Sequence, residues 1–514
     1  MRIVLAENRQ TDFIAILMLL ISGCFVPLCP ADEAEPTADK DEKREIPFTI
    51  LKISVVDLDG APIAGASVSG VGLRTKAERG SHYGWAEKTH GTPSGGVTDD
   101  EGITELRCPQ FVYEQLEVGE VTLLVEHPDY VTFREDRVVG DEVAKVSLQY
   151  GRLMVVSAID AESKQPVTTH LHGVLSGYGS AKEWEPLSGG KLISRTIDRK
   201  RSRLRMVHVP PDGPVKFSDI IDLSEYGDKR RVLLKDVELH AGVRVEGKLD
   251  ENVPRPVKNG TVIAYVTVGI EADGWDYSGQ NSWSDWTTIK EDGTFVFESL
   301  PRKTVAGLIA VSDGWICTAP DPADFIRLGI ADRVTRGGNR VKPQLAKLEG
   351  NRIEPVIEME STATCRVKVT TKEGEPIAGA DVGMSPNQLT LTGGSTIVGS
   401  GYSMRVMLGM SEEERSMGWT EERRKLMVAS GATTDRTRYY KQTNADGIVE
   451  FHTLPGGTKE MPRTESLSAR HELYEQPSSD ENRLRRQTSV QLVRDEVTEV
   501  TIVMDRKGTK VIAD

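Results

Sequence analysis

The stretch Ile50–Gly70 reads ILKISVVDLDGAPIAGASVSG, and Cys365–Met384 repeats its pattern as CRVKVTTKEGEPIAGADVGM. Both contain Gly-x-Pro-Ile-Ala-Gly-Ala-x-Val, at Gly60–Val68 and at Gly374–Val382. Each stretch begins with apolar residues at alternate positions, which is the pattern of a strand with one buried face. A glycine-containing turn and a proline then lead into a second alternating run. The repeat predicts related β-domains far apart in the chain.

Three kinds of element recur along the rest of the chain: looser copies of this opening, a second element and a closing strand. The looser openings are Arg152–Val174 and Val243–Val266. The second element is a short polar lead, an acidic turn, a glycine and an alternating strand, at Thr98–Cys108, Ile289–Pro301 and Thr443–Pro455. The third is a closing strand, at Val143–Tyr150, Arg231–His240, Arg352–Glu360 and Glu496–Met504. Such Asp-Gly turns between alternating apolar runs favour hairpins.

Successive openings divide the chain into four domains, at 48–150, 151–241, 242–360 and 361–514. The period of two within the strands is typical of antiparallel sheets packed face to face. We therefore expect an all-β protein of tandem antiparallel seven-stranded β-sandwiches. Ser411–Ser430 has charges at helical spacing and predicts one short helix inserted in the last domain.

Composition supports this fold class and narrows the function. The chain has 514 residues, with 38% hydrophobic and 6% aromatic residues and a formal net charge of −14. Scattered glycine and proline, 48 and 25 residues, indicate many turns and exclude collagen. An acidic chain lacks the basic surface of an unselective nucleic-acid-binding protein.

The N-terminus predicts export. Phe13–Ile21 is an uninterrupted apolar run, and Cys29-Pro30-Ala31 resembles a signal-peptidase site, so residues 1–31 are expected to be a signal peptide. The alternative is a lipoprotein, because Ile21-Ser22-Gly23-Cys24 resembles a lipobox that would make Cys24 the lipidated residue. Residues 32–47 are charged and predict a disordered spacer. The expected location is the periplasm, the cell surface or the medium.

The combination of Gly-x-Pro-Ile-Ala-Gly-Ala-x-Val, Thr-Asp/Asn-x-x-Gly and Phe-x-x-Leu-Pro elements resembles the carboxypeptidase regulatory-like domain family. The match is good at Gly60–Leu106 and Gly374–Pro455, moderate in 242–360 and poor in 151–241. The resemblance implies a transthyretin-like (prealbumin-like) seven-stranded sandwich. It also implies a non-catalytic module that occurs in series on bacterial secreted and envelope proteins.

Catalytic, cofactor and metal sites are not predicted. Gly-x-Ser-x-Gly, a P-loop and the zinc pattern His-Glu-x-x-His do not occur in the sequence. Cys108, Cys317 and Cys365 are widely spaced, as expected for buried thiols. Acidic stretches Asp57–Gly60 and Asp99–Gly102 are better explained as turns than as calcium loops, since the bidentate glutamate is missing.

The candidate ligand-binding residues are Trp275, Tyr277, Trp283 and Trp286, in the stretch GWDYSGQNSWSDW. Indole faces beside carboxylate and amide groups can stack on sugar rings and bond their hydroxyls. The alternative is a hairpin whose indoles cover an edge of the sandwich.

We therefore expect a non-catalytic exported cell-envelope protein that acts as a scaffold or binding array. The alternatives are a carbohydrate-binding surface protein and an accessory subunit of an extracellular enzyme. Expected partners are cell-wall or extracellular polysaccharide or other envelope proteins, with no nucleic acid and with the membrane only through the N-terminal signal or lipid. Contacts are expected on the long loops 73–97 and 386–442.

Overall fold

A computed structural model describes most of the chain. The described residues are 47–76, 82–85, 90–91, 95–112, 116–140, 143–175, 184–194, 197, 203–227, 229–267, 270–271, 274–275, 281–327, 340–389, 391, 395–411, 413–414, 421–435, 437–476 and 487–507. The predicted signal peptide with Cys24 and nearly all of the predicted spacer lie outside these residues.

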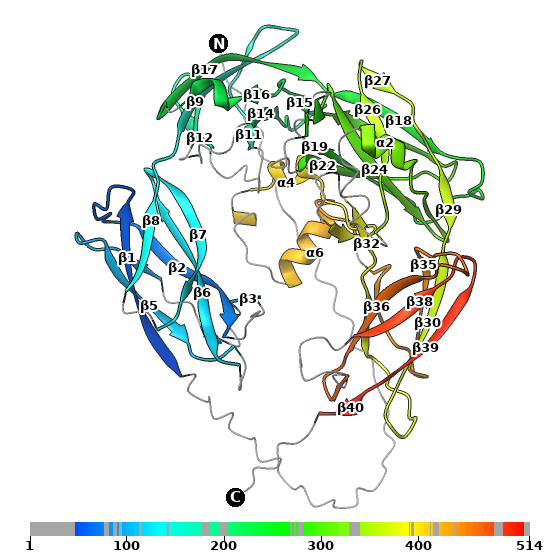
Figure 1. Cartoon of the computed structure of the whole chain (residues 1–514). Helices are drawn as coiled ribbons and strands as arrows, with labels where there is room; N and C mark the ends of the chain where they lie inside the picture. The colour runs from blue at the N-terminus through cyan, green and yellow to red at the C-terminus, as the bar shows by residue number, and fades with distance from the viewer. Residues whose placement is uncertain are drawn as a thin grey trace, which may run out of the picture. The chain divides into compact units, whose positions relative to one another are not determined.

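The first β-sandwich comprises β1 to β8 and has two sheets, coloured blue to cyan in Figure 1. One sheet has the order β5-β1-β8, and the other has the order β3-β2-β6-β7 with β4 also paired to β2. The strands are β1 (Phe48–Asp57), β2 (Ser67–Thr75), β3 (His82–Gly84), β4 (Gly96–Val97), β5 (Ile103–Pro109), β6 (Val118–His127), β7 (Tyr130–Val138) and β8 (Ala144–Leu148). Leu51, Ile53 and Val55 alternate along β1 and are buried in its core.

The second sandwich, β9 to β17, is one hydrogen-bonded set of nine strands. Its order is β11-β14-β15-β17-β9-β13-β12, with β10 on β9 and β16 on β14. The elements are β9 (Leu153–Asp160), β10 (Pro166–Val167), β11 (Leu171–Leu175), β12 (Trp184–Leu187), β13 (Lys191–Ser194), β14 (Arg203–His208), β15 (Lys216–Phe217), β16 (Ile221–Asp222), the 3₁₀ helix η2 (Leu223–Tyr226) and β17 (Arg231–Ala241).

The third sandwich, β18 to β29, has a sheet of order β23-β18-β27, with β28 on β18. Its second sheet has the order β22-β19-β24-β25-β29, with β26 on β24, and β20 pairs with β21. The elements are β18 (Val243–Leu249), β19 (Thr261–Thr267), β20 (Ile270–Glu271), β21 (Gly274–Trp275), β22 (Asn281–Thr288), β23 (Thr294–Leu300), β24 (Thr304–Ser312), β25 (Trp315–Cys317), α2 (Pro322–Arg327), β26 (Gln344–Leu348), β27 (Arg352–Ile353), β28 (Val356–Ile357) and β29 (Met359–Ser361).

The fourth sandwich, β30 to β40, has sheets of order β35-β30-β39 and β34-β31-β36-β38 and the pairs β32-β33 and β37-β40. The elements are β30 (Ala363–Thr370), β31 (Asp381–Met384), β32 (Asn387–Leu389), β33 (Ser395–Ile397), α4 (Met404–Gly409), α6 (Glu421–Ala429), β34 (Tyr440–Gln442), β35 (Ile448–Leu454), β36 (Arg463–Arg470), β37 (Tyr474–Glu475), β38 (Thr488–Leu492), β39 (Val497–Val503) and β40 (Asp505–Arg506). The chain is thus all-β in tandem sandwiches, as predicted.

One pairing recurs in all four sandwiches and corrects the expectation of purely antiparallel sheets. The opening strand pairs antiparallel with one neighbour and parallel with the closing strand of the same sandwich. The parallel pairs are β1-β8, β9-β17, β18 with β27 and β28, and β30-β39. A hairpin turn cannot connect two parallel neighbouring strands, because they need a long crossover connection. Here the connection is the rest of the sandwich.

A buried threonine explains why Thr-Asp/Asn-x-x-Gly recurs after the Pro-Ile-Ala-Gly-Ala turn. In the first sandwich Thr98 Oγ1 donates to the Ile63 carbonyl at 2.7 Å and accepts from the Ala66 N–H at 2.9 Å. In the fourth, Thr443 makes the same pair with Ile377 and Ala380, at 2.7 and 2.9 Å. The hydroxyl therefore ties the two recurring elements together in both sandwiches.

The acidic turn that follows is held by its own first residue. Asp99 Oδ1 accepts from Glu101 N at 3.1 Å and from Ile103 N at 2.7 Å. Asn444 does the same for Asp446 and Ile448. These carboxylate and amide oxygens are satisfied by backbone donors, which is the turn chemistry expected from the sequence.

The helical insertion differs from the prediction in extent. The helix α6 (Glu421–Ala429) lies inside the predicted range 411–430, but α4 (Met404–Gly409) precedes it. Ser403 supplies the N-cap of α4, since its side chain accepts from Val406 N. Charge spacing could not indicate α4, because Met404–Gly409 contains a single charged residue.

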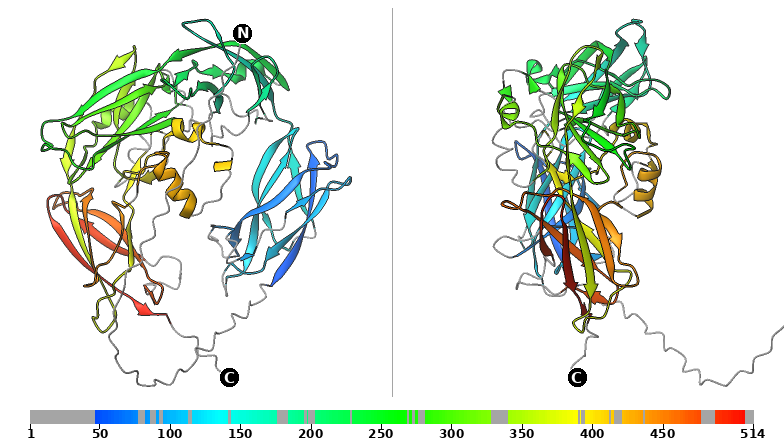
Figure 2. Two further views of the ribbon diagram at one scale, coloured as in Figure 1. Left: turned by 180° about the vertical axis from the view of Figure 1, so that it is seen from behind. Right: turned by 90° about the vertical axis from the view of Figure 1, so that its right-hand side faces the viewer.

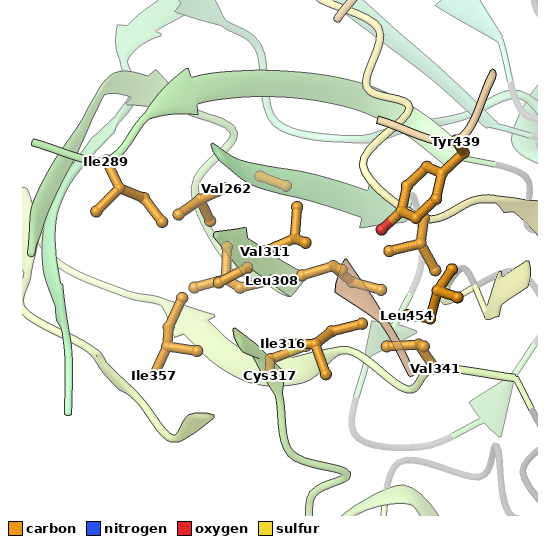
Figure 3. Packing of buried hydrophobic residues seen from close by; sticks show 14 of the residues in the cluster. Val262, Ile289, Leu308, Val311, Ile316, Cys317, Val341, Ile357, Tyr439 and Leu454 are labelled. Atoms are coloured by element: carbon orange, nitrogen blue, oxygen red, sulfur yellow. The ribbon is translucent and has the colours of Figure 1, made fainter. Parts of the chain in front are cut away.

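The third and fourth sandwiches share one continuous cluster of buried apolar side chains, which also takes in Val174, Val207, Val209, Val215 and Phe217 of the second. The first sandwich and the rest of the second have clusters of their own. Figure 3 shows part of this shared core, where Val311 and Leu308 of the third sandwich lie near Tyr439 and Leu454 of the fourth. Phe217 of the second sandwich joins it by an edge-on contact with Trp283, with ring centroids 4.9 Å apart.

We predict that Thr443→Val lowers the free energy of unfolding of the fourth sandwich by about 2–4 kcal/mol. The substitution keeps the side-chain shape but leaves Ala380 N–H and the Ile377 carbonyl buried without a partner. Urea unfolding, monitored by hydrogen exchange, measures this free energy. The matched control is Thr501→Val, on the exposed side of β39. Equal effects of the two variants would contradict this role of Thr443.

Candidate functional site

The long insertion of the fourth sandwich, between β31 and β34, packs on the β22-β19-β24 sheet of the third. Tyr265 Oη donates to the Ser400 carbonyl at 3.3 Å and accepts from Gln388 Nε2 at 2.5 Å. Trp286 Nε1 donates to the Gly431 carbonyl at 3.0 Å. Figure 2 shows α4, in yellow, against the green strands of that sheet. The insertion is therefore part of the junction between the two sandwiches.

A buried carboxylate anchors α4 to this sheet. Asp285 of β22 is 8% exposed and accepts hydrogen bonds from Ser403, the N-cap of α4, and from the backbone of Trp286. Burial raises the pKa of the Asp285 carboxyl, and the two hydrogen bonds and the charge of Arg405 oppose that effect.

Gly401 lets the insertion approach the sheet closely. A Cβ atom at this position would lie 2.9 Å from Trp286 Cβ and 3.0 Å from Ile263 Cγ1. Such distances are shorter than normal contacts between carbon atoms. Any larger residue at position 401 must therefore push the insertion away from the third sandwich.

A cavity of about 830 Å³ lies beside this contact, between the third and fourth sandwiches. Its volume is within the range of small-molecule sites. Apolar walls come from Trp286 and Val311 of the third sandwich and from Ile397 and Val398 of the insertion. Polar and charged side chains complete the lining: Asn259, Thr261, Thr288, Asp313, Ser400, Thr434, Asp435, Thr437, Arg438, Tyr439, Lys441, His452 and Thr453.

Arg438 links the two sides of the cavity. One terminal nitrogen donates to the Asn259 carbonyl, and Asn259 Nδ2 in turn donates to Asp313 Oδ2 at 2.7 Å. The other nitrogen, Nη1, is buried and lies 3.7 Å from Asp313 Oδ1, which is too far for a hydrogen bond. Nη1 has no hydrogen-bond acceptor among the described residues.

Two further groups in the lining have unused hydrogen-bonding capacity. Lys441 Nζ donates to the Glu450 carbonyl at 2.8 Å, and an ammonium has three donors. Burial lowers the pKa of Lys441 and repulsion from Arg438 adds to the effect, while the charges of Asp313 and Glu450 oppose it. The hydroxyl of Tyr439 is buried with no hydrogen-bond partner in the described part of the chain, and burial raises its pKa.

The four predicted aromatic residues do not form one exposed plane. Trp283 is 0% exposed and belongs to the shared core, so its place in a ligand surface is corrected. Its position facing Phe217 explains this, because an indole there fills the space between two sheets. Trp286 lines the cavity. Only the backbone of Trp275 is described, in β21, and Tyr277 lies outside the described residues.

Residues with metal-ligand chemistry are dispersed. In the described ranges no group of three or more His, Cys, Asp or Glu side chains is placed to hold a metal ion. Cys108, Cys317 and Cys365 are free and buried, and burial raises their pKa values to about 12, about 12 and about 11. No helix among the described residues is long and apolar enough to span a bilayer.

Sequence reasoning missed the charged residues of the cavity. Arg438 and Lys441 stand in the 386–442 insertion, where ligand contacts were expected, but no local pattern distinguishes them. Arg438 meets Asn259 because the insertion folds back on the segment just before β19, 179 residues earlier in the chain.

Comparison with known proteins gives neither a family nor a curated relative, since no family model and no curated protein matches the chain. The carboxypeptidase regulatory-like resemblance therefore stays a prediction.

The similar solved structures include bacterial pilins. GBS52, the minor pilin of Streptococcus agalactiae, is 12% identical with a TM-score of 0.24, over 53% of this chain and 100% of that chain. A streptococcal ancillary pilin is 11% identical with a TM-score of 0.23, over 69% of this chain and 100% of its own. BcpA, the major pilin subunit of Bacillus cereus, is 8% identical with a TM-score of 0.16, over 90% and 100%. At TM-scores this low the superpositions say nothing of function, and the fold is defined by the chain's own sheets.

We expect Gly401→Ala to loosen the insertion and to lower stability by about 1–3 kcal/mol, because the new methyl group overlaps Trp286 and Ile263. Gly409→Ala is the matched control, since a Cβ there meets nothing within 4 Å. Hydrogen exchange of residues 397–411 measures the effect. Faster exchange only in Gly401→Ala is the expected result, and equal exchange in both variants would contradict the close contact.

We predict that the Asp285→Asn variant removes the free-energy cost of ionising Asp285 in the folded protein, a cost that depends on pH. Because the pKa of Asp285 is higher in the folded than in the unfolded protein, ionisation destabilises the folded state. That cost is absent below the unfolded pKa of about 4. It grows as the pH rises and is complete above the folded pKa. The difference in Tm between Asp285→Asn and wild type should therefore increase from pH 4 to pH 7, measured by calorimetry. A constant difference would contradict the shift.

Proposed function

We propose that the chain is an exported cell-envelope protein whose β-sandwiches act in series as a scaffold, without a catalytic role of its own. The observation that carries the proposal is the near absence of linkers between the sandwiches. A single residue, Gly242, separates β17 from β18, and a single residue, Thr362, separates β29 from β30. Long flexible linkers would allow domains to move independently, whereas these junctions leave little freedom.

Both short junctions are built into the structure. Thr362 N donates to the Gly314 carbonyl of the third sandwich at 3.0 Å, and its hydroxyl donates to the His452 carbonyl of the fourth at 3.1 Å. A Cβ on Gly242 would lie 2.2 Å from Ser299 Oγ, so this junction requires glycine. These contacts favour a stiff unit from the second to the fourth sandwich.

An aromatic stack supports the junction between the first and second sandwiches. Tyr130 of β7 stacks on Tyr150 with ring centroids 4.3 Å apart, and their hydroxyls are 2.7 Å apart. The guanidinium of Arg230, just before β17, lies 4.0 Å from the Tyr150 ring centroid. This contact restrains the first sandwich against the second, as the short junctions restrain the later ones.

Export is supported by the apolar run Phe13–Ile21 and the charged spacer that follows it. The carboxypeptidase regulatory-like resemblance agrees with an envelope location. Other envelope proteins are the proposed partners of the scaffold. A saccharide platform of three indoles is not supported, because Trp283 is buried, while Trp286 lines the cavity.

Cell fractionation and mass spectrometry of the N-terminus test this proposal in a bacterial host. We expect the tagged chain outside the cytoplasm with Asp32 as its first residue, both in wild type and in Cys24→Ser. A lipid on Cys24 that is lost in Cys24→Ser would favour the lipoprotein form of the same proposal. A full-length chain in the cytoplasm, with Met1 retained, would overturn export and with it the envelope scaffold.

A further inference from the structure

We propose that the cavity between the third and fourth sandwiches binds a saccharide that carries a carboxylate, such as a hexuronate unit of an acidic polysaccharide. This inference goes beyond the scaffold function and needs neither export nor assembly, because all of its residues belong to the folded chain. It rests on the balance of donors and acceptors in the lining and on the shape of the walls.

Arg438 and Lys441 bring hydrogen-bond donors without acceptors to one part of the cavity, whose lining also contains the carboxylates of Asp313 and Asp435. Arg438 Nη1 has no acceptor, and Lys441 uses one of its three donors on a carbonyl. The nearest carboxylate, Asp313, accepts from Asn259 and lies 3.7 Å from Arg438. An anion that entered here would supply the missing acceptors through charge-assisted hydrogen bonds.

The protein around Lys441 offers its ammonium no carboxylate within ion-pair distance among the described residues. Glu450, the neighbouring acid, is paired with Arg366 of β30 and with His452. Asp313 and Glu450 attract this half-buried ammonium from beyond ion-pair distance, but burial and the charge of Arg438 outweigh them, so the charged form of Lys441 carries a net cost. A ligand carboxylate beside it would relieve that cost, so Lys441 is the residue that we expect to distinguish acidic from neutral ligands.

The remaining walls suit a sugar. Trp286 and Val311 form apolar surface, against which the C–H face of a pyranose can pack. Thr288 and Thr437 place hydroxyls in the same lining, and Asn259 places an amide there. Flat apolar surface beside a few polar groups and a cationic pair matches a ring that has hydroxyls at its edge and one carboxylate.

Isothermal titration calorimetry with the purified chain that begins at Asp32 tests the proposal. The probes are a galacturonic acid oligosaccharide, the same oligosaccharide with its carboxylates methyl-esterified, and an aspartate-rich peptide. We expect binding of the acidic oligosaccharide that weakens with salt and is at least tenfold weaker for the ester. Failure to bind the acidic oligosaccharide, or equal affinity for the ester, would overturn the proposal, and so would binding of the acidic peptide alone.

Matched variants place the site. Lys441→Gln should weaken binding of the acidic oligosaccharide at least tenfold, whereas Lys459→Gln should leave it unchanged. Lys459 belongs to the same sandwich but pairs with Glu496 at 2.8 Å and does not line the cavity. Both variants are first compared with wild type by thermal unfolding. Equal affinities of the two folded variants would place any binding elsewhere and overturn this site.

A second measurement does not depend on Lys441. Titration with the acidic oligosaccharide should change the tryptophan fluorescence of the wild type, and Trp286→Phe should remove that change. Trp315→Phe, a partly buried indole of the third sandwich that does not line the cavity, is the control that should keep it. A fluorescence change that persists in Trp286→Phe would contradict binding in this cavity.

Discussion

Parallel backbone pairing between the opening and closing strand of each sandwich is the constraint on which the rest of the structure depends. It makes the opening strand central, between the closing strand and an antiparallel neighbour, which in the first, third and fourth sandwiches is the strand after the acidic turn. Because the two strands are parallel, the chain enters a sandwich at one end and leaves it at the opposite end. The closing strand then continues into the next opening strand across a single residue, Gly242 or Thr362.

The shared core of the third and fourth sandwiches depends on the insertion as much as on the strands. Glycine at 401 allows the insertion to reach the sheet, and the Tyr265, Asp285 and Trp286 side chains bond to it. Each of these residues stands on β19 or β22 of the third sandwich. Beside that contact the two surfaces diverge and enclose the cavity. A polar cavity next to a dry core is where sandwich proteins have room for a ligand.

The fold could be predicted from the sequence because its signals are local. Alternation along β1 and β30, the Pro-Ile-Ala-Gly-Ala turn and the Thr-Asp/Asn-x-x-Gly element all act within a few residues or between repeated partners. The site could not be predicted in the same way. Trp283 and Trp286 are three residues apart and look alike in the sequence, but one fills the core and the other lines the cavity. Arg438 meets Asn259 only through the folded insertion.

Mechanical load would reach the parallel strand pair first. A pull on the two ends of a sandwich acts on its opening strand from one end and on the adjacent closing strand from the other. Since the two strands are parallel neighbours, the force slides them past each other, and their hydrogen bonds share the load instead of breaking one after another. In β30 and β39 this shared register extends over seven residue pairs, from Thr364–Val497 to Thr370–Val503. The parallel pairing of β1 with β8 and of β30 with β39 thus makes the first and fourth sandwiches resist extension along the chain.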